Sequence, residues 1–149
     1  MPIGEICNRE VVIVQRDTTV AEAARLMREH HVGALVVVKE VSGKRKPVGL
    51  VTDRDLVVEV LATQLDAAVI TVGDIMLQEL GTVPESSGVF EAIQFMRAKA
   101  VRRLPVVDGH GVLVGIVALD DLLTLLAEEL SELAALISRE QEKESRARH

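Results

Sequence analysis

The stretch GLVTDRDL at residues 49–56 occurs a second time, in altered form, as GIVALDDL at residues 115–122. In the first copy an apolar run is followed by hydroxyl and charged residues, and then by a second apolar run from Leu56 to Leu61. We interpret the two runs as a strand and a helix, so the polar cluster lies where the first helical amides have no partner. Such a junction is a good place to hold an anion.

The rest of the chain repeats in the same way. A shift of 69 residues superposes the first half on the second, and the shift becomes 66 after the loop KEVSGKRKP, which is longer in the first half. Each half reads as strand, helix, strand, strand, helix. For the first half this order predicts strands at 11–14, 32–38 and 48–51, with helices from about Thr19 and Asp53. The repeat indicates two small units that bury their apolar faces against each other.

Composition limits the classes of function. With 149 residues, 48% of them hydrophobic, the chain can fill a core without disulfides or metals. It has neither a run of about 18 apolar residues nor a signal-like N-terminus, so we expect a cytoplasmic protein outside the membrane. The net charge of −6 argues against general nucleic-acid binding. One cysteine and four scattered histidines exclude an intramolecular disulfide and make a zinc site improbable, so we expect no metal.

The C-terminal segment carries an amphipathic stripe beyond the second copy of the repeat. Its apolar residues recur at helical spacing: Leu122, Leu126, Leu130, Leu133 and Ile137. The stripe packs either on the core of its own chain or on a second copy. Because it exceeds what one small module needs, we predict a homodimer.

These features together resemble the tandem cystathionine β-synthase (CBS) domain proteins, whose paired repeats are also called a Bateman module. The resemblance rests on the order, spacing and duplication of three elements: a Val-Gly-Asp-Ile-Met segment at 72–76, the strand Leu-Pro-Val-Val-Asp at 104–108, and the Thr-x-x-Asp turn. It implies an α/β (α+β) fold of two β-α-β-β-α units packed with pseudo-twofold symmetry. We place repeat 1 at residues 2–65, repeat 2 at 66–127, and a helical extension with a polar tail at 128–149.

The polar cluster fits the ligands of that family. The two carboxylate oxygens of Asp55 suit the paired hydroxyls of a ribose, and the Thr52 hydroxyl can meet a phosphate near the helix N-terminus. On this interpretation Asp53 caps the helix. The alternative is that Asp53 and Asp55 are both simple helix caps.

The resemblance also implies two unequal clefts. In the first, Thr52 and Asp55 face Thr82 and the segment 101–103. We expect one or both of Arg102 and Arg103 to bind a phosphate, with Arg54 as a third candidate. In the second, Asp121 keeps the ribose acceptor and faces the segment 32–34, which includes Ala34. Ala118 replaces the threonine there, so phosphate is held less well. The full set of predicted nucleotide-binding residues is Ile13, Ala34, Thr52, Arg54, Asp55, Thr82, Val101, Arg102, Arg103 and Asp121.

The resemblance therefore implies a stand-alone regulatory module that binds AMP, ADP or ATP and signals to an effector protein of unknown identity. S-adenosylmethionine and NAD are alternative ligands, since all of these share adenosine. The first alternative function is an interaction scaffold whose clefts have decayed. The second is a nucleotide-processing enzyme, which we disfavour because the predicted cleft lacks a histidine or cysteine beside the phosphates. We expect no catalytic residue and no catalytic cofactor.

Overall fold

The computed structural model describes residues 1–76 and 81–148. It divides into a compact unit, Met1–Val117, and a second unit that begins at Ala118. The first unit contains the sheet β1-β2-β3 and most of the sheet β4-β5-β6. The mixed α+β architecture predicted from the sequence is confirmed.

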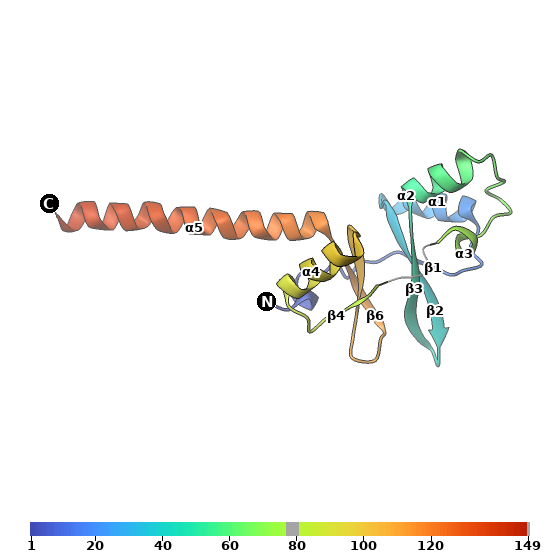
Figure 1. Ribbon diagram of the computed structural model, residues 1–149, viewed down its shortest axis with the longest axis horizontal. Coiled ribbons are helices and arrows are strands. Elements are labelled where there is room, and N and C mark those ends of the chain that lie inside the picture. The colour runs from blue at the N-terminus through green and yellow to red at the C-terminus, as the bar shows by residue number, and fades with distance from the viewer. Residues whose placement is uncertain (77–80, 149) are drawn as a thin grey trace. The chain divides into compact units, whose positions relative to one another are not determined.

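The first sheet has the predicted order of elements. β1 (Ile13–Val14) lies parallel to β2 (Ala34–Val41), which pairs antiparallel with β3 (Lys44–Thr52). The helix α1 (Val20–His30) connects β1 to β2, and β3 leads into α2 (Asp53–Asp55), which continues as η2 (Leu56–Leu61) (Figure 1). The β-branched strands and the 3.6-residue period of α1 therefore gave the correct element types.

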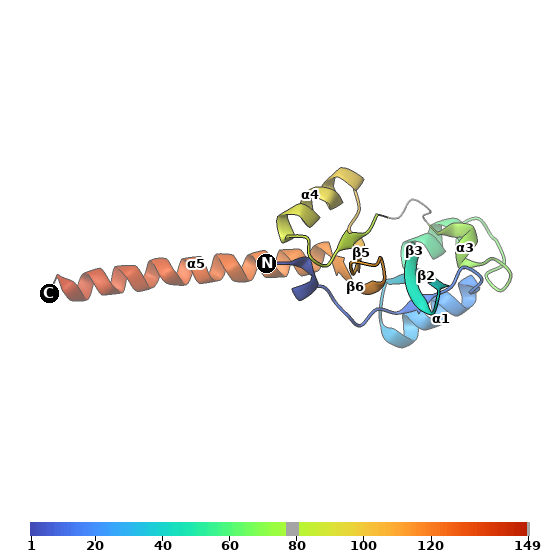
Figure 2. The ribbon, with the colours of Figure 1, turned by 90° about the horizontal axis from the view of Figure 1, so that it is seen from below.

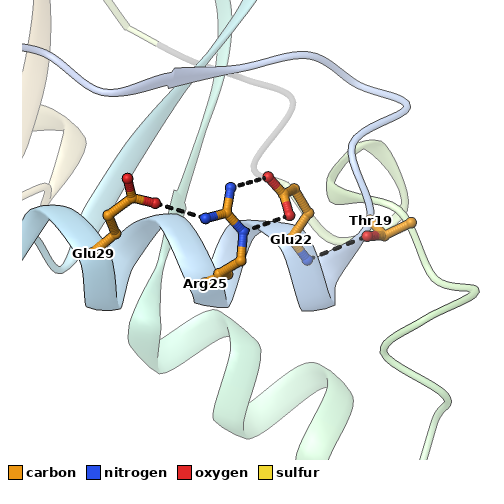
Figure 3. Close-up of polar contacts among 4 residues, drawn as sticks. All are labelled: Thr19, Glu22, Arg25 and Glu29. Carbon is orange, nitrogen blue, oxygen red and sulfur yellow. Dashed lines mark hydrogen bonds and ion pairs between the residues drawn. The ribbon is translucent and has the colours of Figure 1, made fainter.

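The helix α1 begins at a side-chain cap, as predicted, but only half of the expected capping box is formed. The Thr19 hydroxyl accepts a hydrogen bond from the Glu22 amide at 3.2 Å. The Glu22 carboxylate binds Arg25 instead of returning to Thr19, and Arg25 also binds Glu29 (Figure 3). The hydrogen bond from Arg25 lowers the pKa of Glu22. This exposed ladder supports the helix and pairs Arg25 with two carboxylates.

The turn between β2 and β3 is shorter than the predicted loop. The two strands are joined by Ser42 and Gly43 alone, with φ of 54° and 75°. Two positive φ values are typical of a tight hairpin turn. The residues Lys44 to Pro47, which the sequence placed in the loop, belong to β3 and pair with β2. The prediction failed there because lysines and a proline on an edge strand look like a loop in the sequence.

The second half repeats the first closely. β4 (Val83–Pro84) lies parallel to β5 (Arg103–Val107), next to β6 (Leu113–Ala118), and α4 (Val89–Lys99) connects β4 to β5. The bounds of α1 and α4 differ by the predicted 69 residues at both ends. Both helices also end at a left-handed residue with a φ of 54°, His31 in one and Ala100 in the other.

The segments that open the two repeats are exchanged within the chain, so that each one packs on the other repeat. The amides of Ile3 and Gly4 in η1 (Ile3–Glu5) donate to the carbonyls of Ser87 and Glu85, at 2.7 and 2.9 Å. At the positions 69 residues away, the amides of Val72 and Gly73 in α3 (Val72–Ile75) donate to the carbonyls of Thr18 and Arg16, at 2.8 and 2.9 Å. Figure 2 shows η1 near α4. Each opening segment therefore docks on the other repeat, which is the reciprocal pattern that twofold pseudosymmetry requires.

The core extends from one repeat to the other within the first unit. Val72 and Met76 of the second opening segment are buried in a cluster with Leu35, Val37 and Val51 of the first sheet. A second cluster packs β6 against the first sheet, through Leu113, Ile116, Val36, Val38 and Leu50. The two repeats therefore bury apolar surface against each other, as predicted.

The second unit is the helix α5 (Leu119–Ala147). Its first turns correspond to α2 and η2 of repeat 1, and it then continues for about twenty residues more. Leu122 is 3% exposed, whereas Leu126, Leu130, Leu133 and Ile137 are all exposed. In the part of the chain that the structure describes, no helix is long and apolar enough to cross a membrane.

Candidate functional site

Thr52 and Asp55 are locked together at the start of α2. The Thr52 amide donates to Asp55 Oδ2 at 2.9 Å, and the Asp55 amide donates to Thr52 Oγ1 at 3.2 Å. This reciprocal pair is a capping box, and both residues are half-buried. The predicted division of roles is wrong in one respect, because Asp55 and Thr52 cap the helix, and Asp53 does not.

The cap leaves part of each side chain available to a ligand. Among the described residues, Oδ1 of Asp55 accepts no hydrogen bond, and the Thr52 hydroxyl still has its hydrogen to donate. Asp55 can therefore accept from a sugar hydroxyl through Oδ1 while Oδ2 holds the turn. The ribose role predicted for Asp55 stays a prediction, and it is now compatible with a structural role for the same residue.

Asp53 and Arg54 take other positions. Asp53 Oδ1 accepts a hydrogen bond from the Arg54 amide at 2.8 Å, and the Asp53 amide donates to the Gly33 carbonyl at 2.9 Å. A β-carbon on Gly33 would lie 3.1 Å from Asp53 Oδ2, so the glycine lets the carboxylate approach the backbone. Arg54 is exposed, which suits the third phosphate contact that the sequence suggested.

Residues predicted for the two different clefts meet on one sheet. Ala34, assigned to the second cleft, is the direct strand partner of Thr52, assigned to the first. Ile13 lies on β1 and pairs with Val36 of the same sheet. The end of β3 and the start of β2 therefore bring elements of both predicted clefts into contact. The sequence alone could not predict that Ala34 pairs with Thr52, because this pairing depends on the strand register.

The opposing segment belongs to the same compact unit. Val101 follows α4, and its amide donates to the Met96 carbonyl at 3.0 Å. Arg102 is exposed, and Arg103, the first residue of β5, is half-buried like Thr82. Since β6 packs on the first sheet, the two sheets that carry these residues are neighbours. That the arginines and Thr82 share one nucleotide with Asp55 stays a prediction.

Asp121 repeats the cap of Asp55 in a simpler form. The Ala118 amide donates to Asp121 Oδ2 at 3.1 Å, and Ala118 has no hydroxyl with which to return the bond. The same carboxylate-to-amide bond occurs at Thr71 and Asp74, at 3.0 Å, and it lowers the pKa of Asp74. An aspartate three residues after a helix cap is therefore a recurrent structural device in this chain. It does not by itself mark a ligand site.

The other chemistry of the described residues is limited. No group of three or more histidine, cysteine, aspartate or glutamate side chains is arranged to hold a metal ion there. A shallow hollow of about 540 Å³ lies between the end of β1 and β2, and none of the predicted site residues lines it. Its lining residues are Gln15, Arg16, Asp17, Val38, Lys39 and Glu40. No local sequence pattern indicates this hollow, because its two walls are far apart along the chain.

Comparison with known proteins identifies the fold family. The CBS domain family model matches residues 3–62 and 72–128. An uncharacterized protein of Methanopyrus kandleri is 40% identical over 121 residues, which are 81% of this chain and 60% of that protein. Hypoxic response protein 1 of Mycobacterium tuberculosis is 35% identical over 124 residues, which are 83% of this chain and 84% of that protein. The chain thus spans little more than half the length of the first relative and most of the second.

Two solved structures show what such proteins can bind. Hypoxic Response Protein I, solved with two coordinated zinc ions, has a TM-score of 0.71 at 32% identity, covering 83% of this chain and 98% of that one. The CBS domain pair of protein MJ0100, in complex with 5′-methylthioadenosine and S-adenosyl-L-methionine, has a TM-score of 0.75 at 25% identity. That match covers 87% of this chain and 98% of the other.

Proposed function

This chain belongs to the CBS domain family, and on that premise we propose that it is a regulatory module that binds an adenosyl ligand at the Thr52–Asp55 turn. Ligand binding would shift the two repeats or the dimer halves, and a separate effector protein would read the change. The preferred ligands are AMP, ADP and ATP, which would make the module a sensor of the energy state. S-adenosylmethionine and NAD are the alternatives, because the adenosine part is common to all of them.

The observation that carries the proposal is the reciprocal pair of Asp55 and Thr52, which adds a hydroxyl to the cap aspartate. Its Oδ2 is fixed by the Thr52 amide, so the carboxylate is held in one orientation before any ligand arrives. Its Oδ1 is turned to no donor among the described residues, which leaves an ionised acceptor for a ribose hydroxyl. The adenosyl ligands of the MJ0100 pair support this choice of ligand class.

The phosphate part of the proposal rests on charge. Thr52 can donate its hydroxyl hydrogen, and Arg102 and Arg103 lie at the start of the neighbouring sheet. Guanidiniums pair well with phosphate oxygens, so a nucleotide with phosphates should bind more tightly than adenosine. S-adenosylmethionine, which carries a positive charge at sulfur, would gain nothing from the same arginines.

Titration calorimetry of the full chain with ATP, ADP, AMP, S-adenosylmethionine and NAD tests the proposal. We expect a saturable heat with at least one of them and an unchanged ligand after incubation, as measured by chromatography. Turnover of the ligand would support the nucleotide-processing enzyme instead. No heat with any of the five would contradict the proposal and leave the interaction scaffold.

A further inference from the structure

The hairpin between β2 and β3 is longer than its counterpart in repeat 2. In repeat 2, residues 108–112 connect β5 to β6. The equivalent part of repeat 1 is residues 39–46, which extend the two strands by three antiparallel pairs (Figure 1). All of these residues are exposed except Lys46, which is half-buried, so they add little to the core. Because repeat 2 folds without such an extension, the fold does not require it.

Two lysines lie opposite each other in this extension. Lys39 and Lys46 are direct antiparallel partners, so their side chains lie on the same side of the strand pair. Like charges in this arrangement destabilise a strand pair. Arg45 has Glu40 as its strand partner, whereas within residues 1–76 and 81–148 neither Lys39 nor Lys46 forms an ion pair. An anionic group from outside the chain would remove this repulsion.

The edge of β2 next to β1 is open beyond the end of β1. The two strands pair only as far as Val14 opposite Val37, whereas β2 continues for four more residues. The Val36 amide donates to the Val12 carbonyl at 3.1 Å, so the alternation of a strand points the amide and carbonyl of Glu40 to the same edge. In the described part of the chain, no other strand lies beside β2 on that side. Such an edge can accept an added strand.

The hollow of about 540 Å³ lies along this open edge. Its far wall is held in place, because the Gln15 amide donates to Thr18 Oγ1 at 3.1 Å and the Arg16 carbonyl accepts from the Gly73 amide at 2.9 Å. These two hydrogen bonds fix the turn that takes the chain away from β2. Arg16 lines the hollow from this wall and Lys39 lines it from β2, so both walls carry a cation.

We propose that an extended segment of a partner protein, with an acidic side chain at every second residue, pairs with the open edge of β2 and occupies the hollow. Its backbone continues the ladder that β1 leaves, and its carboxylates meet Arg16, Lys39 and Lys46, which we call the basic edge. The outer edge of β3 is a poorer site, because Pro47 has no amide to donate. The inference rests on the proposed function only in taking the effector protein as the source of the segment.

A protein segment fits the hollow better than a nucleic acid or an anionic membrane. Asp17 and Glu40 line the same hollow as Arg16 and Lys39. A duplex or an anionic lipid surface presents phosphates throughout, so some of them would lie against these carboxylates. A strand places successive side chains on opposite faces, so acidic residues can meet the cations while neutral residues meet the carboxylates. Only a polypeptide can also continue the backbone ladder of β2.

Titration of the isotope-labelled full chain with a synthetic peptide of alternating glutamate and threonine, followed by NMR without nucleotide, tests the surface. We expect saturable shifts of the Arg16, Lys39 and Glu40 amides. A peptide of the same composition with its glutamates and threonines in two blocks should bind at least about tenfold more weakly, because it loses charge-assisted hydrogen bonds. No saturable shift, or equal affinity of the two peptides, would contradict the proposal. Tighter binding of mixed-sequence duplex DNA or of phosphatidylserine vesicles at the same amides and salt would overturn the choice of a protein partner.

Paired variants test the basic edge itself. The Lys39→Ala, Lys46→Ala double variant should bind the alternating peptide at least about tenfold more weakly. The Arg28→Ala, Arg97→Ala double variant removes the same charge from exposed positions on α1 and α4 and should keep the affinity within about twofold. Equal losses in the two variants would show that net charge, and not the basic edge, attracts the peptide. Neither pair belongs to the Thr52–Asp55 turn, so ATP calorimetry on the same samples separates failure of this inference from failure of ligand binding.

Discussion

The turns that end β3 and β6 have nearly the same backbone and different chemistry. Thr52 has φ and ψ of −115° and 163°, and Ala118 has −120° and 156°. In both, the amide at the cap donates to an aspartate three residues later. Only Thr52 returns a hydrogen bond through its side chain. The two turns therefore share the structural part of the motif and differ in the hydroxyl.

This difference separates two roles that the motif combines. Among residues 1–76 and 81–148, the hydrogen bond from a cap amide to an aspartate three residues later occurs at Asp55, Asp74 and Asp121, and Asp74 lies in an opening segment. The bond is therefore what the fold requires of the aspartate, and ligand binding must be judged from what is added to it. At Asp55 the structure adds the Thr52 hydroxyl, and the contribution of Arg102 and Arg103 stays a prediction. At Asp121 the hydroxyl is missing.

Replacing each aspartate with alanine should give the largest difference in ATP affinity between the two turns. Asp55→Ala should weaken ATP about ten- to a hundredfold, because an ionised acceptor contributes roughly 1.5 to 3 kcal/mol. Asp121→Ala should leave the tight phase of the titration intact. Both variants lose the same cap bond, so both should lose about 0.5–2 kcal/mol of unfolding free energy in urea. Loss of the tight phase in Asp121→Ala, with ATP binding preserved in Asp55→Ala, would reverse the assignment of the clefts.

Removing the two arginines isolates the phosphate contribution. The Arg102→Ala, Arg103→Ala double variant should weaken ATP at least about tenfold more than adenosine, since charge-assisted hydrogen bonds contribute on the order of 1.5 to 3 kcal/mol each. Calorimetry with both ligands measures the difference. Equal losses for ATP and adenosine would show that the arginines do not contact phosphate.

The two opening segments can be compared in the same way, because each has a glycine in close contact with the other repeat. A β-carbon on Gly4 would lie 2.9 Å from the Glu85 β-carbon, and one on Gly73 would lie 2.9 Å from the Arg16 carbonyl oxygen. Gly4→Ala and Gly73→Ala should each therefore cost about 1–3 kcal/mol in urea unfolding. Gly109→Ala, with no atom within 4 Å of the added carbon, should change stability by less than about 0.5 kcal/mol. A neutral Gly4→Ala would mean that the first opening segment is not closely docked.

We expect the smallest effect from exchanging the cap residues of the two turns. Thr52→Ala should destabilise the protein by about 0.5–2 kcal/mol, and Ala118→Thr should stabilise it by a similar amount at most, because the backbone at both caps already fits a threonine. Thermal unfolding followed by circular dichroism measures both. A destabilising Ala118→Thr would show that the two turns are less alike than their dihedral angles indicate.

The sequence predicted much of the fold because its signals are local. The 69-residue shift fixes the equivalence of α1 and α4, and the Thr19 cap and the strands follow from nearby residues. The edge-strand lysines were misread because charge and proline occur in loops and on edges alike. The exchange of the opening segments was missed for a different reason: a hydrogen bond from Gly4 to Glu85 leaves no trace in local periodicity.

The candidate site was predicted less completely than the fold. The residue types of the Thr52–Asp55 turn indicated a capping box and an anion site, but not which aspartate makes the cap. Both Asp53 and Asp55 lie in the first turn, where acidic residues are favoured, and only the Asp55 geometry distinguishes them. The contact between Ala34 and Thr52 depends on strand register.

The exchanged openings also set an order of events during synthesis. The amide of Asn8 donates to the carbonyl of Ile116, and the amide of Gly4 donates to that of Glu85, so both residues wait for partners that are translated much later. At roughly 5–20 residues per second, the ribosome needs about 5–20 s to cover that distance. Through this interval Asn8 lacks its Ile116 partner, and the loop that this hydrogen bond finally closes includes nearly all of the first unit. The nascent chain therefore cannot complete repeat 1 and then repeat 2, and both must close together at the end.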